Sequence, residues 1–449
     1  MRRILSATEY EALLRSLSPE AMQQGLDVVA AAARELMAQR GLHRAVVLCG
    51  RPLQRMGGLV AAQLRATMAV WPEDELPDLS DRLIVDMLFS PAGDPRYAAW
   101  IDAMEKADDP VLSVAIPAGV DPDSGKIRAA AVKAVLTVAP FGYLMGLFLH
   151  EGLDHCGRIL PVGGEIEGEA GLTRFEDTDA RRLLPPRRRT AHKGDAGKAL
   201  LCVGSPRYVG AGLLSARACL AAGCGILYVA CPDVVRMALC RLPEAIGVPV
   251  GPDWNEKTCR AAIGAMAGMS ALGVGCGVGS GDISSLIEAA LKTGLPLVLD
   301  ADGLNCLSRH PALYGLLHEK VVLTPHPGEM SRLTGLPLEQ VLEDPVAVAG
   351  EHARRWGCIV LLKGAATVVS DGRRTRFVAE GNAGLGKGGS GDVLTGIVAG
   401  LLAQGVSPFD GACLGSYLLG ASAEKAFDLL RERMLRATNV TEALEEWNE

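Results

Sequence analysis

The chain is organised around a glycine-rich stretch, Gly388-Gly389-Ser390-Gly391-Asp392, which is followed by an apolar segment, 393–404, with helical spacing. Consecutive glycines let a backbone approach a ligand closely and direct its N–H groups toward it. If the following segment is a helix, the stretch lies at a helix N-terminus, where free N–H groups and the helix dipole favour a phosphate. Asp392 beside such a site could act as a base for an incoming hydroxyl group. The alternative is a loop that only caps the helix, because a single glycine-rich loop is a weak signal.

The composition excludes several classes of protein. The 449-residue chain has a net charge of −7, which argues against a nucleic-acid-binding groove. Its 12 cysteines form no CxxC pair, a pattern typical of reduced thiols in a cytoplasmic protein. Residues 1–17 lack the apolar segment of a signal peptide, and the most apolar stretch, 211–231, contains Arg217 and several glycines. We therefore expect a cytoplasmic protein that binds neither membranes nor nucleic acid.

Apolar strand-like segments alternate with helical segments along most of the chain. Strands are predicted at 45–50, 83–86, 111–116, 133–138, 199–203, 227–230, within 271–279, 296–302 and 321–329, and at 359–363. Helices are predicted at 6–40 (two helices), 57–68, 210–222 and 393–404. This alternation is typical of α/β proteins, and it predicts doubly wound parallel sheets in three-layer domains. The irregular segment 161–190, which contains Pro185-Pro186 and several arginines, marks the domain boundary.

Chemically active side chains follow several strands of the second half. Asp300 and Asp302 end one predicted strand, His326 and Glu329 follow the next, and Lys363 ends another. Each alone has an ordinary alternative: the acids could cap a helix, the histidine could lie in a turn, and the lysine could be a surface charge. Because the carboxyl ends of parallel strands meet at one edge of a sheet, we expect these residues to line one crevice with the 388–392 loop.

The motifs of the second half, taken together, resemble those of a known family. They are His192-Lys193-Gly194-Asp195, Gly210-Ala211, Gly275-Cys276-Gly277-Val278-Gly279, Asp300-Ala301-Asp302, Thr324-Pro325-His326-Pro327-Gly328-Glu329, Lys363-Gly364-Ala365-Ala366-Thr367 and Gly388-Gly389-Ser390-Gly391-Asp392. In this order, over residues 185–440, they resemble the YjeF C-terminal family of ADP-dependent NAD(P)H-hydrate dehydratases. The resemblance implies a ribokinase-like fold. It also implies a hydro-lyase that converts (6S)-NADHX or (6S)-NADPHX to NADH or NADPH while ADP becomes AMP and phosphate.

The same resemblance implies roles for individual residues. Asp392 is the implied base that accepts the proton of the substrate hydroxyl group. The residues that would hold ADP are Lys363, Gly364, Ala365, Ala366, Thr367, Gly389, Ser390 and Gly391. The residues that would contact the hydrated dinucleotide are Ala211, Gly277, His326 and Asp392. Mg²⁺ would bridge the phosphates, although no acidic cluster in the sequence identifies its ligands. Cys276 replaces a family proline and Leu419 a frequent histidine, and neither position carries the implied chemistry.

The first half resembles the YjeF N-terminal family, the NAD(P)H-hydrate epimerases, in residues 1–6, 84–89 and 116–125, which implies a Rossmann-like domain. The family's glycine-rich loop corresponds to 50–60, where Arg55 and Met56 replace two glycines and would block close approach of a phosphate. Ala115 stands at the position of the acid/base aspartate, and Ala118 at that of a potassium-ligand serine. Only Asp86, which matches another potassium ligand, is retained. Because a methyl group cannot transfer a proton, we expect a vestigial K⁺ site and no epimerase activity.

The sequence therefore predicts an epimerase-like domain over 1–170, a linker over 171–190 and a dehydratase domain over 191–449. The whole chain resembles the bifunctional nicotinamide nucleotide repair enzymes. Three alternatives stay open: a fully bifunctional epimerase and dehydratase, an ATP-dependent small-molecule kinase of the same fold, and a nucleotide-binding protein without activity. We expect a homo-oligomer that acts on small molecules.

Overall fold

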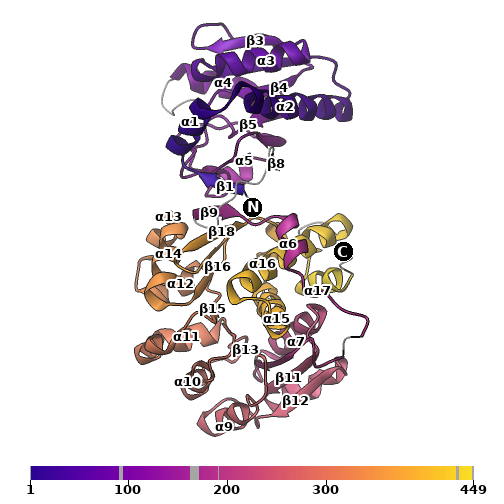
Figure 1. Ribbon diagram of the computed structural model, residues 1–449, viewed down its shortest axis with the longest axis vertical. Helices are drawn as coiled ribbons and strands as arrows, with labels where there is room; N and C mark the ends of the chain where they lie inside the picture. Colours follow the sequence, from indigo (N-terminus) through magenta and orange to yellow (C-terminus); the bar gives the residue numbers. More distant parts are fainter. Residues whose placement is uncertain (1, 90–94, 162–170, 191, 431–433, 447–449) are drawn as a thin grey trace. The chain divides into compact units, whose positions relative to one another are not determined.

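The computed structural model describes residues 2–89, 95–161, 171–190, 192–430 and 434–446 (Figure 1). The chain divides into two compact units, Met1–Gly168 and Glu169–Glu449. Both units are α/β structures built on largely parallel sheets, so the predicted fold class is confirmed. Within the described ranges, no helix combines the length and the apolar character that crossing a membrane requires.

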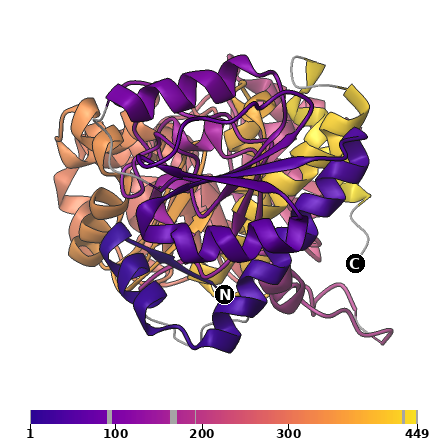
Figure 2. The same cartoon turned by 90° about the horizontal axis from the view of Figure 1, so that it is seen from above.

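The first unit has a parallel sheet with the strand order β3-β2-β4-β5-β6-β8, and helices lie on both of its faces (Figure 2). Helices α2 and α3 pack over one apolar core and α4 over another, on the opposite face. A short parallel pair, β1 with β7, belongs to the same unit. The bounds are β1 Arg2–Leu5, α1 Ala7–Ser16, α2 Pro19–Arg40, β2 Ala45–Gly50, α3 Gln54–Leu64, β3 Thr67–Trp71, β4 Leu83–Met87, α4 Pro95–Lys106, β5 Val111–Val114, β6 Leu136–Ala139, β7 Tyr143–Leu144, α5 Gly152–His155 and β8 Arg158–Pro161.

The helix predicted at 57–68 differs in position from the observed one. Helix α3 begins at Gln54 and ends at Leu64, because Arg65 takes a left-handed conformation (φ 52°) that closes the last turn. The residues that follow form the edge strand β3, which pairs with β2. The prediction was wrong here because a short apolar run satisfies helical and strand spacing equally well.

The second unit is built on a sheet with the strand order β12-β11-β10-β13-β14-β15-β16-β17-β18-β9. Strands β10 to β16 pair in parallel, whereas β17 is antiparallel to both of its neighbours. Strands β11 and β12 lie on one side of β10, and β13 to β16 lie on the other. Ligands of such sheets bind outside the carboxyl ends of the strands where the order reverses, here between β10 and β13.

The elements of the second unit alternate along the chain as follows. The bounds are β9 Gly171–Arg174, α6 Asp177–Leu183, β10 Lys198–Cys202, α7 Val209–Ala221, β11 Ile226–Cys231, α8 Asp233–Ala238, β12 Ala245–Pro249, α9 Glu256–Gly264, β13 Ala271–Val274, α10 Ser284–Lys292, β14 Leu297–Leu299, α11 Asp302–Arg309, β15 Val321–Leu323, α12 Pro327–Thr334, α13 Leu338–Glu343, α14 Pro345–Trp356, β16 Ile359–Leu362, β17 Thr367–Ser370, β18 Arg374–Val378, α15 Ser390–Ala403, α16 Pro408–Leu430 and α17 Ala437–Glu445.

The segment predicted as a linker, 171–190, contributes structure to the second unit. Strand β9 pairs in parallel with β18, and helix α6 follows it. Phe175, between them, is fully buried in the core of that unit. Strand β9 has only four residues, too few for alternation to reveal a strand. Its partner β18 lies about 200 positions further along the chain, so no local pattern indicates the pairing. The preceding part of the predicted boundary, 162–170, lies outside the described residues.

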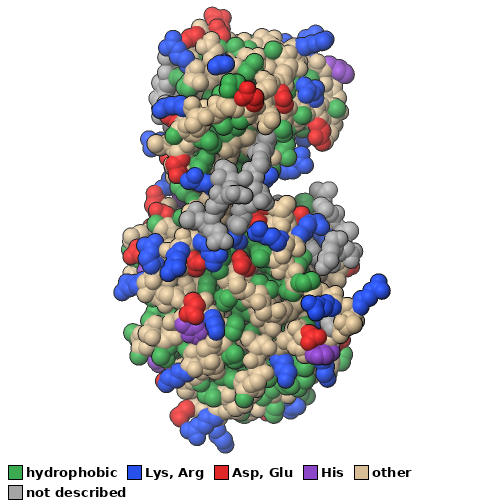
Figure 3. Space-filling model, viewed as in Figure 1, with side chains coloured by type: hydrophobic (Ala, Val, Ile, Leu, Met, Phe, Trp, Pro, Cys, Tyr) green, Lys and Arg blue, Asp and Glu red, His purple; other side chains and the backbone are tan. Residues whose placement is uncertain are grey.

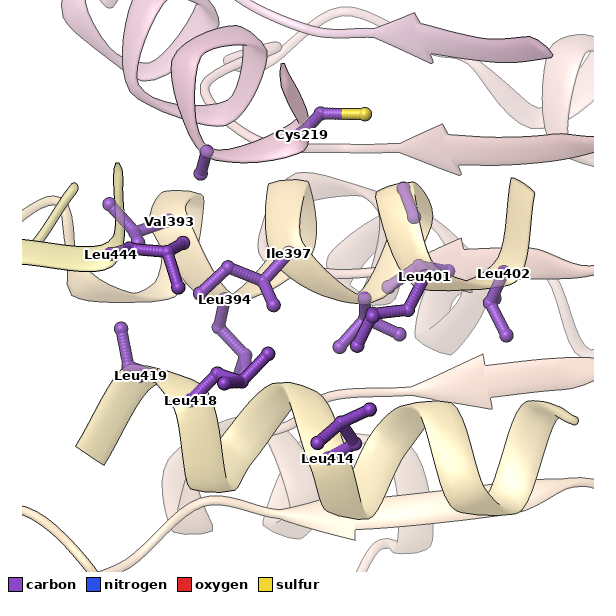
Figure 4. Close-up of a cluster of buried hydrophobic side chains, with 14 of the residues drawn as sticks. Cys219, Val393, Leu394, Ile397, Leu401, Leu402, Leu414, Leu418, Leu419 and Leu444 are labelled. Carbon is purple, nitrogen blue, oxygen red and sulfur yellow. The ribbon is translucent and has the colours of Figure 1, made fainter. Parts of the chain in front are cut away.

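Helix α15 occupies the centre of the second unit. All of its residues from 393 to 403 are buried, as expected of a helix that is apolar on every side. Figure 4 shows Ile397 and Leu401 on α15 facing Leu414 and Leu418 on α16, with α7 on the other side. The helix predicted at 393–404 is thus confirmed as a central core element.

Two glycines bring the backbones of α15 and α7 into contact. A Cβ atom on Gly396 would lie 2.2 Å from the carbonyl oxygen of Ser215, and one on Gly400 would lie 2.7 Å from that of Cys219. The two glycines are four residues apart, so they lie on one face of α15. The distance between the two helices is therefore fixed by backbone atoms.

Charged side chains do not gather into a basic surface on the face shown in Figure 3. Lys and Arg are interspersed there with Asp and Glu among the described residues of both units. This distribution agrees with the negative net charge of −7.

We expect Gly396→Ala to lower the free energy of unfolding by about 1–3 kcal/mol, because the new methyl group must displace a backbone carbonyl of α7. The matched control is Gly264→Ala at the end of α9, where an added Cβ would meet no atom within 4 Å. That control should leave stability unchanged or raise it by up to about 1 kcal/mol. Urea denaturation followed by circular dichroism measures both. Equal stability of the two variants would contradict the proposed backbone contact.

Candidate functional site

The glycine-rich loop meets the N-terminus of α15, as the sequence predicts. Gly389 is the N-cap residue with a φ of +103°, a conformation that favours glycine. A side chain on Gly389 would also approach Leu214 Cδ1 to 2.8 Å. Within the described structure no side chain caps this end of α15. The first N–H groups of the helix are therefore available to an anionic ligand.

Asp300, at the end of β14, is the buried acid closest to this loop. It is 1% exposed, and its Oδ1 accepts hydrogen bonds from Lys363 Nζ at 2.7 Å and from the Ala301 N–H at 2.8 Å. Its Oδ2 accepts from Thr395 Oγ1, on α15, at 2.9 Å. A Cβ on Gly391 would lie only 3.3 Å from that same oxygen. A buried charge with this many partners is stabilised in place, and it holds the loop, the helix and the strand end together.

Asp392 lies in the first turn of α15, beside this network. Burial, and after it the negative charge of Asp300, raise the pKa of the Asp392 carboxyl to about 6. The Cys276 thiol and the Lys363 ammonium act in the opposite direction. Above pH 6 the carboxyl is thus ionised, yet it is a stronger base than an ordinary aspartate.

Two residues predicted to contact a dinucleotide touch each other where the strand order reverses. A Cβ on Gly277, after β13, would lie 2.6 Å from Ala211 Cβ and 2.9 Å from Tyr208 Cβ. Ala211 is in the first turn of α7, which follows β10. The structure therefore places Ala211 and Gly277 together at the position where such sheets bind ligands.

His326 is the N-cap residue of α12. Its Nδ1 accepts hydrogen bonds from the Gly328 N–H at 3.0 Å and the Glu329 N–H at 3.4 Å, and Glu329 Oε2 accepts from the His326 N–H at 2.9 Å. Because Nδ1 accepts, the ring proton is on Nε2. The side chain is 52% exposed, so Nε2–H can also be offered to a ligand. The turn role and a binding role are compatible at this residue.

The predicted nucleotide segment 363–367 spans a strand end and a hairpin turn. Lys363 extends inward to Asp300, and its Nζ also lies 3.8 Å from Glu329 Oε2. Gly364 and Ala365 are exposed in the turn between β16 and β17, and Thr367 begins β17. The turn therefore offers mainly backbone groups, while Lys363 belongs to the buried network.

Five of the predicted residues fall into two connected groups. Lys363, Gly391 and Asp392 gather around Asp300, and Ala211 and Gly277 meet at the ends of β10 and β13. Cys276 joins the groups, because it precedes Gly277 and its Sγ lies 4.0 Å from Asp300 Oδ2.

The sequence assigns no role to two members of this network. Thr395 is one polar residue within an apolar helix, and Cys276 stands in a glycine turn. A hydroxyl group in an otherwise apolar helix is the signal that could have identified Thr395, since a buried polar group requires a partner.

The first unit contains a pocket that includes Ala118, one of the positions discussed above. A cavity of about 580 Å³ is bordered by Leu53, Phe89, Ala118 and Arg128, among others. Asp86, behind it, is fully buried, and burial raises its pKa. The segment predicted as a loop at 50–60 is helical from Gln54 onward, where α3 begins, and on this helix Met56 is buried in the core and Arg55 is exposed.

The contacts of Asp86 test whether the first unit can hold a potassium ion. Its Oδ2 accepts hydrogen bonds from Ser113 Oγ and the Ala118 N–H, both at 2.8 Å, and its Oδ1 accepts from the Leu88 N–H at 3.1 Å. The side chains of Ala115 and Ala118 carry no oxygen that could bind an ion. Three of the roughly four lone-pair sites of the Asp86 carboxylate are occupied by protein donors, so this donor set fits K⁺ coordination poorly.

Comparison with known proteins follows the same division into two halves. A family model described as NAD(P)H-hydrate dehydratase matches residues 199–446, and one described as YjeF-related protein N-terminus matches residues 23–145. The chain belongs to the NAD(P)H-hydrate repair family. It is an enzyme of this family, with its dehydratase domain in the second unit.

Relatives of this repair family align over most of the chain. The bifunctional NAD(P)H-hydrate repair enzyme Nnr of Vibrio cholerae is 30% identical, covering 84% of this chain and 76% of that protein. The Nnr of Moorella thermoacetica is 32% identical, covering 87% and 77%. Among solved structures, the ADP/ATP-dependent NAD(P)H-hydrate dehydratase of Bacillus subtilis, co-crystallised with ATP and Mg²⁺, is 29% identical with a TM-score of 0.55, covering 61% of this chain and 96% of that one.

We expect Asp300→Asn to lower the pKa of Asp392 from about 6 toward its ordinary value of 3.8. The substitution removes a negative neighbour and leaves the Lys363 ammonium with only the more distant Glu329 carboxylate, at 3.8 Å, and both changes favour the ionised form of Asp392. Carbon-13 NMR of labelled aspartate carboxyl groups, assigned by comparison with Asp392→Asn, measures the titration.

The matched control for this titration is Asp371→Asn, at the turn between β17 and β18, which should leave the Asp392 titration unchanged. A titration of Asp392 that stays near pH 6 in a folded Asp300→Asn protein would show that Asp300 does not set this pKa.

Proposed function

We propose that the second unit dehydrates (6S)-NADHX and (6S)-NADPHX and uses ADP to activate the hydroxyl group that leaves. The observation that carries the proposal is the juxtaposition of an uncapped helix N-terminus with Asp392, whose pKa of about 6 suits a base at neutral pH. The family membership and the ATP- and Mg²⁺-containing Bacillus subtilis relative support the same function.

The chemistry begins with the poor leaving-group character of hydroxide. Asp392 accepts the proton of the C6 hydroxyl group. The hydroxyl oxygen attacks the β-phosphorus of ADP, and AMP departs. A proton is then lost from the neighbouring ring carbon and the phosphorylated oxygen leaves as inorganic phosphate, which restores the dihydronicotinamide double bond. Phosphate is a far better leaving group than hydroxide, so the second step is easy.

The protein's contribution to this reaction is electrostatic and positional. The N–H groups at the start of α15, from 389 to 391, stabilise the charge of the phosphoryl group in transfer. Gly391 keeps the backbone open to the phosphate, because a side chain there would contact Asp300 and Lys363. The 364–367 turn would hold the nucleotide through its backbone, and Ala211, Gly277 and His326 would contact the dinucleotide.

A divalent ion is the other group that this function involves. Mg²⁺ supplies charge neutralisation on the phosphates when bound, and it characteristically takes phosphate oxygens and water with few protein ligands. Asp302 fits such a shell because it lies near the same strand end and its Oδ2 is held by the Gly279 N–H at 2.7 Å. The donor set is thus compatible with Mg²⁺ bound mainly through the nucleotide.

We propose further that the first unit has lost epimerase activity. Ala115 is buried and cannot transfer a proton, and Asp86 is occupied by three protein donors. The Vibrio cholerae and Moorella thermoacetica relatives are bifunctional enzymes. Our proposal that this chain lacks their epimerase activity rests on these particular side chains.

The dehydratase proposal predicts that (6S)-NADHX and ADP together restore the absorbance of NADH. Asp392→Asn should lower the rate by about 10²–10⁴-fold, since it removes a general base, and nucleotide binding measured by calorimetry should persist. The wild-type rate should fall as the pH drops below about 6, where Asp392 becomes protonated. Parallel reactions with ATP and without nucleotide are the controls. No recovery with either nucleotide would contradict the function, and recovery with ATP alone would contradict the use of ADP.

The epimerase proposal predicts that the protein does not speed the conversion of (6R)-NADHX to (6S)-NADHX above the spontaneous rate. Chromatography that separates the two epimers measures this directly in the Asp392→Asn protein, where dehydration does not consume the product. A bifunctional relative such as the Vibrio cholerae enzyme is the positive control. Rapid interconversion by this chain would contradict the proposed loss of epimerase activity, because it would occur without an acid or base at position 115.

A further inference from the structure

Three side chains that the dehydratase function does not use converge beside α11. Among the residues that the structure describes, Asp282, Cys306 and His310 form a group whose ligand atoms all lie within 4.8 Å of one another. Cys306 is on α11 and His310 is its C-cap residue, four positions later and hence on the same face. Asp282 comes from the loop between β13 and α10.

Two distances in this group are close to those of ligands that share one ion. His310 Nε2 lies 3.5 Å from Asp282 Oδ1, and Cys306 Sγ lies 3.8 Å from the same oxygen. Bond lengths of about 2.0–2.2 Å to nitrogen and oxygen and about 2.3 Å to sulfur, at tetrahedral angles, give separations of about 3.3–3.5 Å and about 3.5–3.7 Å. An ordinary hydrogen bond between the histidine nitrogen and the carboxylate would be shorter, at about 2.7–3.2 Å.

Backbone N–H groups contact two of the three side chains. The Ser284 N–H donates to Asp282 Oδ1 at 2.9 Å and leaves lone pairs of the carboxylate available. The Ile283 N–H is directed at the sulfur of Cys306. An N–H group donated to the sulfur is the kind of outer contact that stabilises a metal-bound thiolate.

We propose that Asp282, Cys306 and His310 bind one Zn²⁺ ion, with water as the fourth ligand. A thiolate, an imidazole and a carboxylate together select zinc over Mg²⁺ or Ca²⁺, which prefer oxygen ligands alone. The ion would join the C-terminus of α11 to the loop that follows Gly279. Because Asp302 at the other end of α11 holds the Gly279 N–H, the ion and Asp302 would fix both ends of this helix to one loop.

Cobalt substitution tests the proposal in tag-free full-length protein. We expect one equivalent of Co²⁺ to give the intense visible bands of a tetrahedral site together with a near-ultraviolet band from thiolate-to-cobalt charge transfer. Added Zn²⁺ should abolish both. Cys306→Ser should remove the charge-transfer band, and His310→Ala should weaken zinc binding by at least about tenfold in competition with a chelating dye. The matched control is Cys240→Ser, which removes an exposed free cysteine and should behave as wild type.

The thermal stability of the same proteins gives a second readout. Zn²⁺ should raise the melting temperature of the wild type and of Cys240→Ser but not of Cys306→Ser, because an ion that binds only the folded state stabilises it. Circular dichroism checks that each variant is folded. A wild-type protein without a tetrahedral cobalt spectrum, or a Cys306→Ser protein that keeps the charge-transfer band, would overturn the proposal. Neither result depends on dehydratase activity, so this test and the enzymatic one fail separately.

Discussion

The structure of the second unit depends on the contact between the backbones of α15 and α7. Gly396 and Gly400 have no side chains to keep the helices apart, so α15 can lie against α7 and over the sheet at the same time. This position brings the N-terminus of α15 to the strand ends. It also places the first turn of α7, with Ala211, against the loop that carries Gly277. Packing in the core thus fixes the N-terminus of α15 relative to the strand ends and to the first turn of α7.

The charged side chains near the N-terminus of α15 determine the chemistry available there. Asp300 is buried but fully paired with Lys363 and Thr395, so its negative charge is retained within a few ångströms of the glycine loop. Burial and, after it, the negative charge of Asp300 raise the pKa of Asp392, and a carboxylate with a raised pKa is a better proton acceptor. The same network that stabilises the loop therefore makes its acid more basic. Structural and chemical roles of Asp300 coincide.

Much of this architecture could be predicted from the sequence, because its signals are local. The strands of the parallel sheets are continuous apolar runs, and the glycine-rich loop is followed directly by an apolar helix. What could not be predicted depends on partners distant in the chain. Strand β9 is defined by β18, and the inward direction of Lys363 is set by Asp300, 63 residues earlier. Thr395 could be located on a helix, but its bond to Asp300 required the tertiary structure.

The predictions for the first unit separate in the same way. Strands β2, β4, β5 and β6 were located from their apolar runs, whereas β1, β7 and β8 were not predicted and the start of β3 was assigned to the preceding helix. The substitutions at Ala115 and Ala118 are visible in the sequence, whereas the three donors to Asp86 are not. The predicted roles of the nucleotide- and substrate-binding residues remain predictions, although the structure places several of them in contact.

The contacts of Asp86 explain why an aspartate can persist at this position. Replacing it with an apolar residue would leave a buried hydroxyl and two buried N–H groups without acceptors, a large cost for one side chain. Selection for folding alone is therefore sufficient to preserve this aspartate after any catalytic demand has ended. The methyl groups of Ala115 and Ala118 make no hydrogen bond, so the fold does not require a polar side chain at either position.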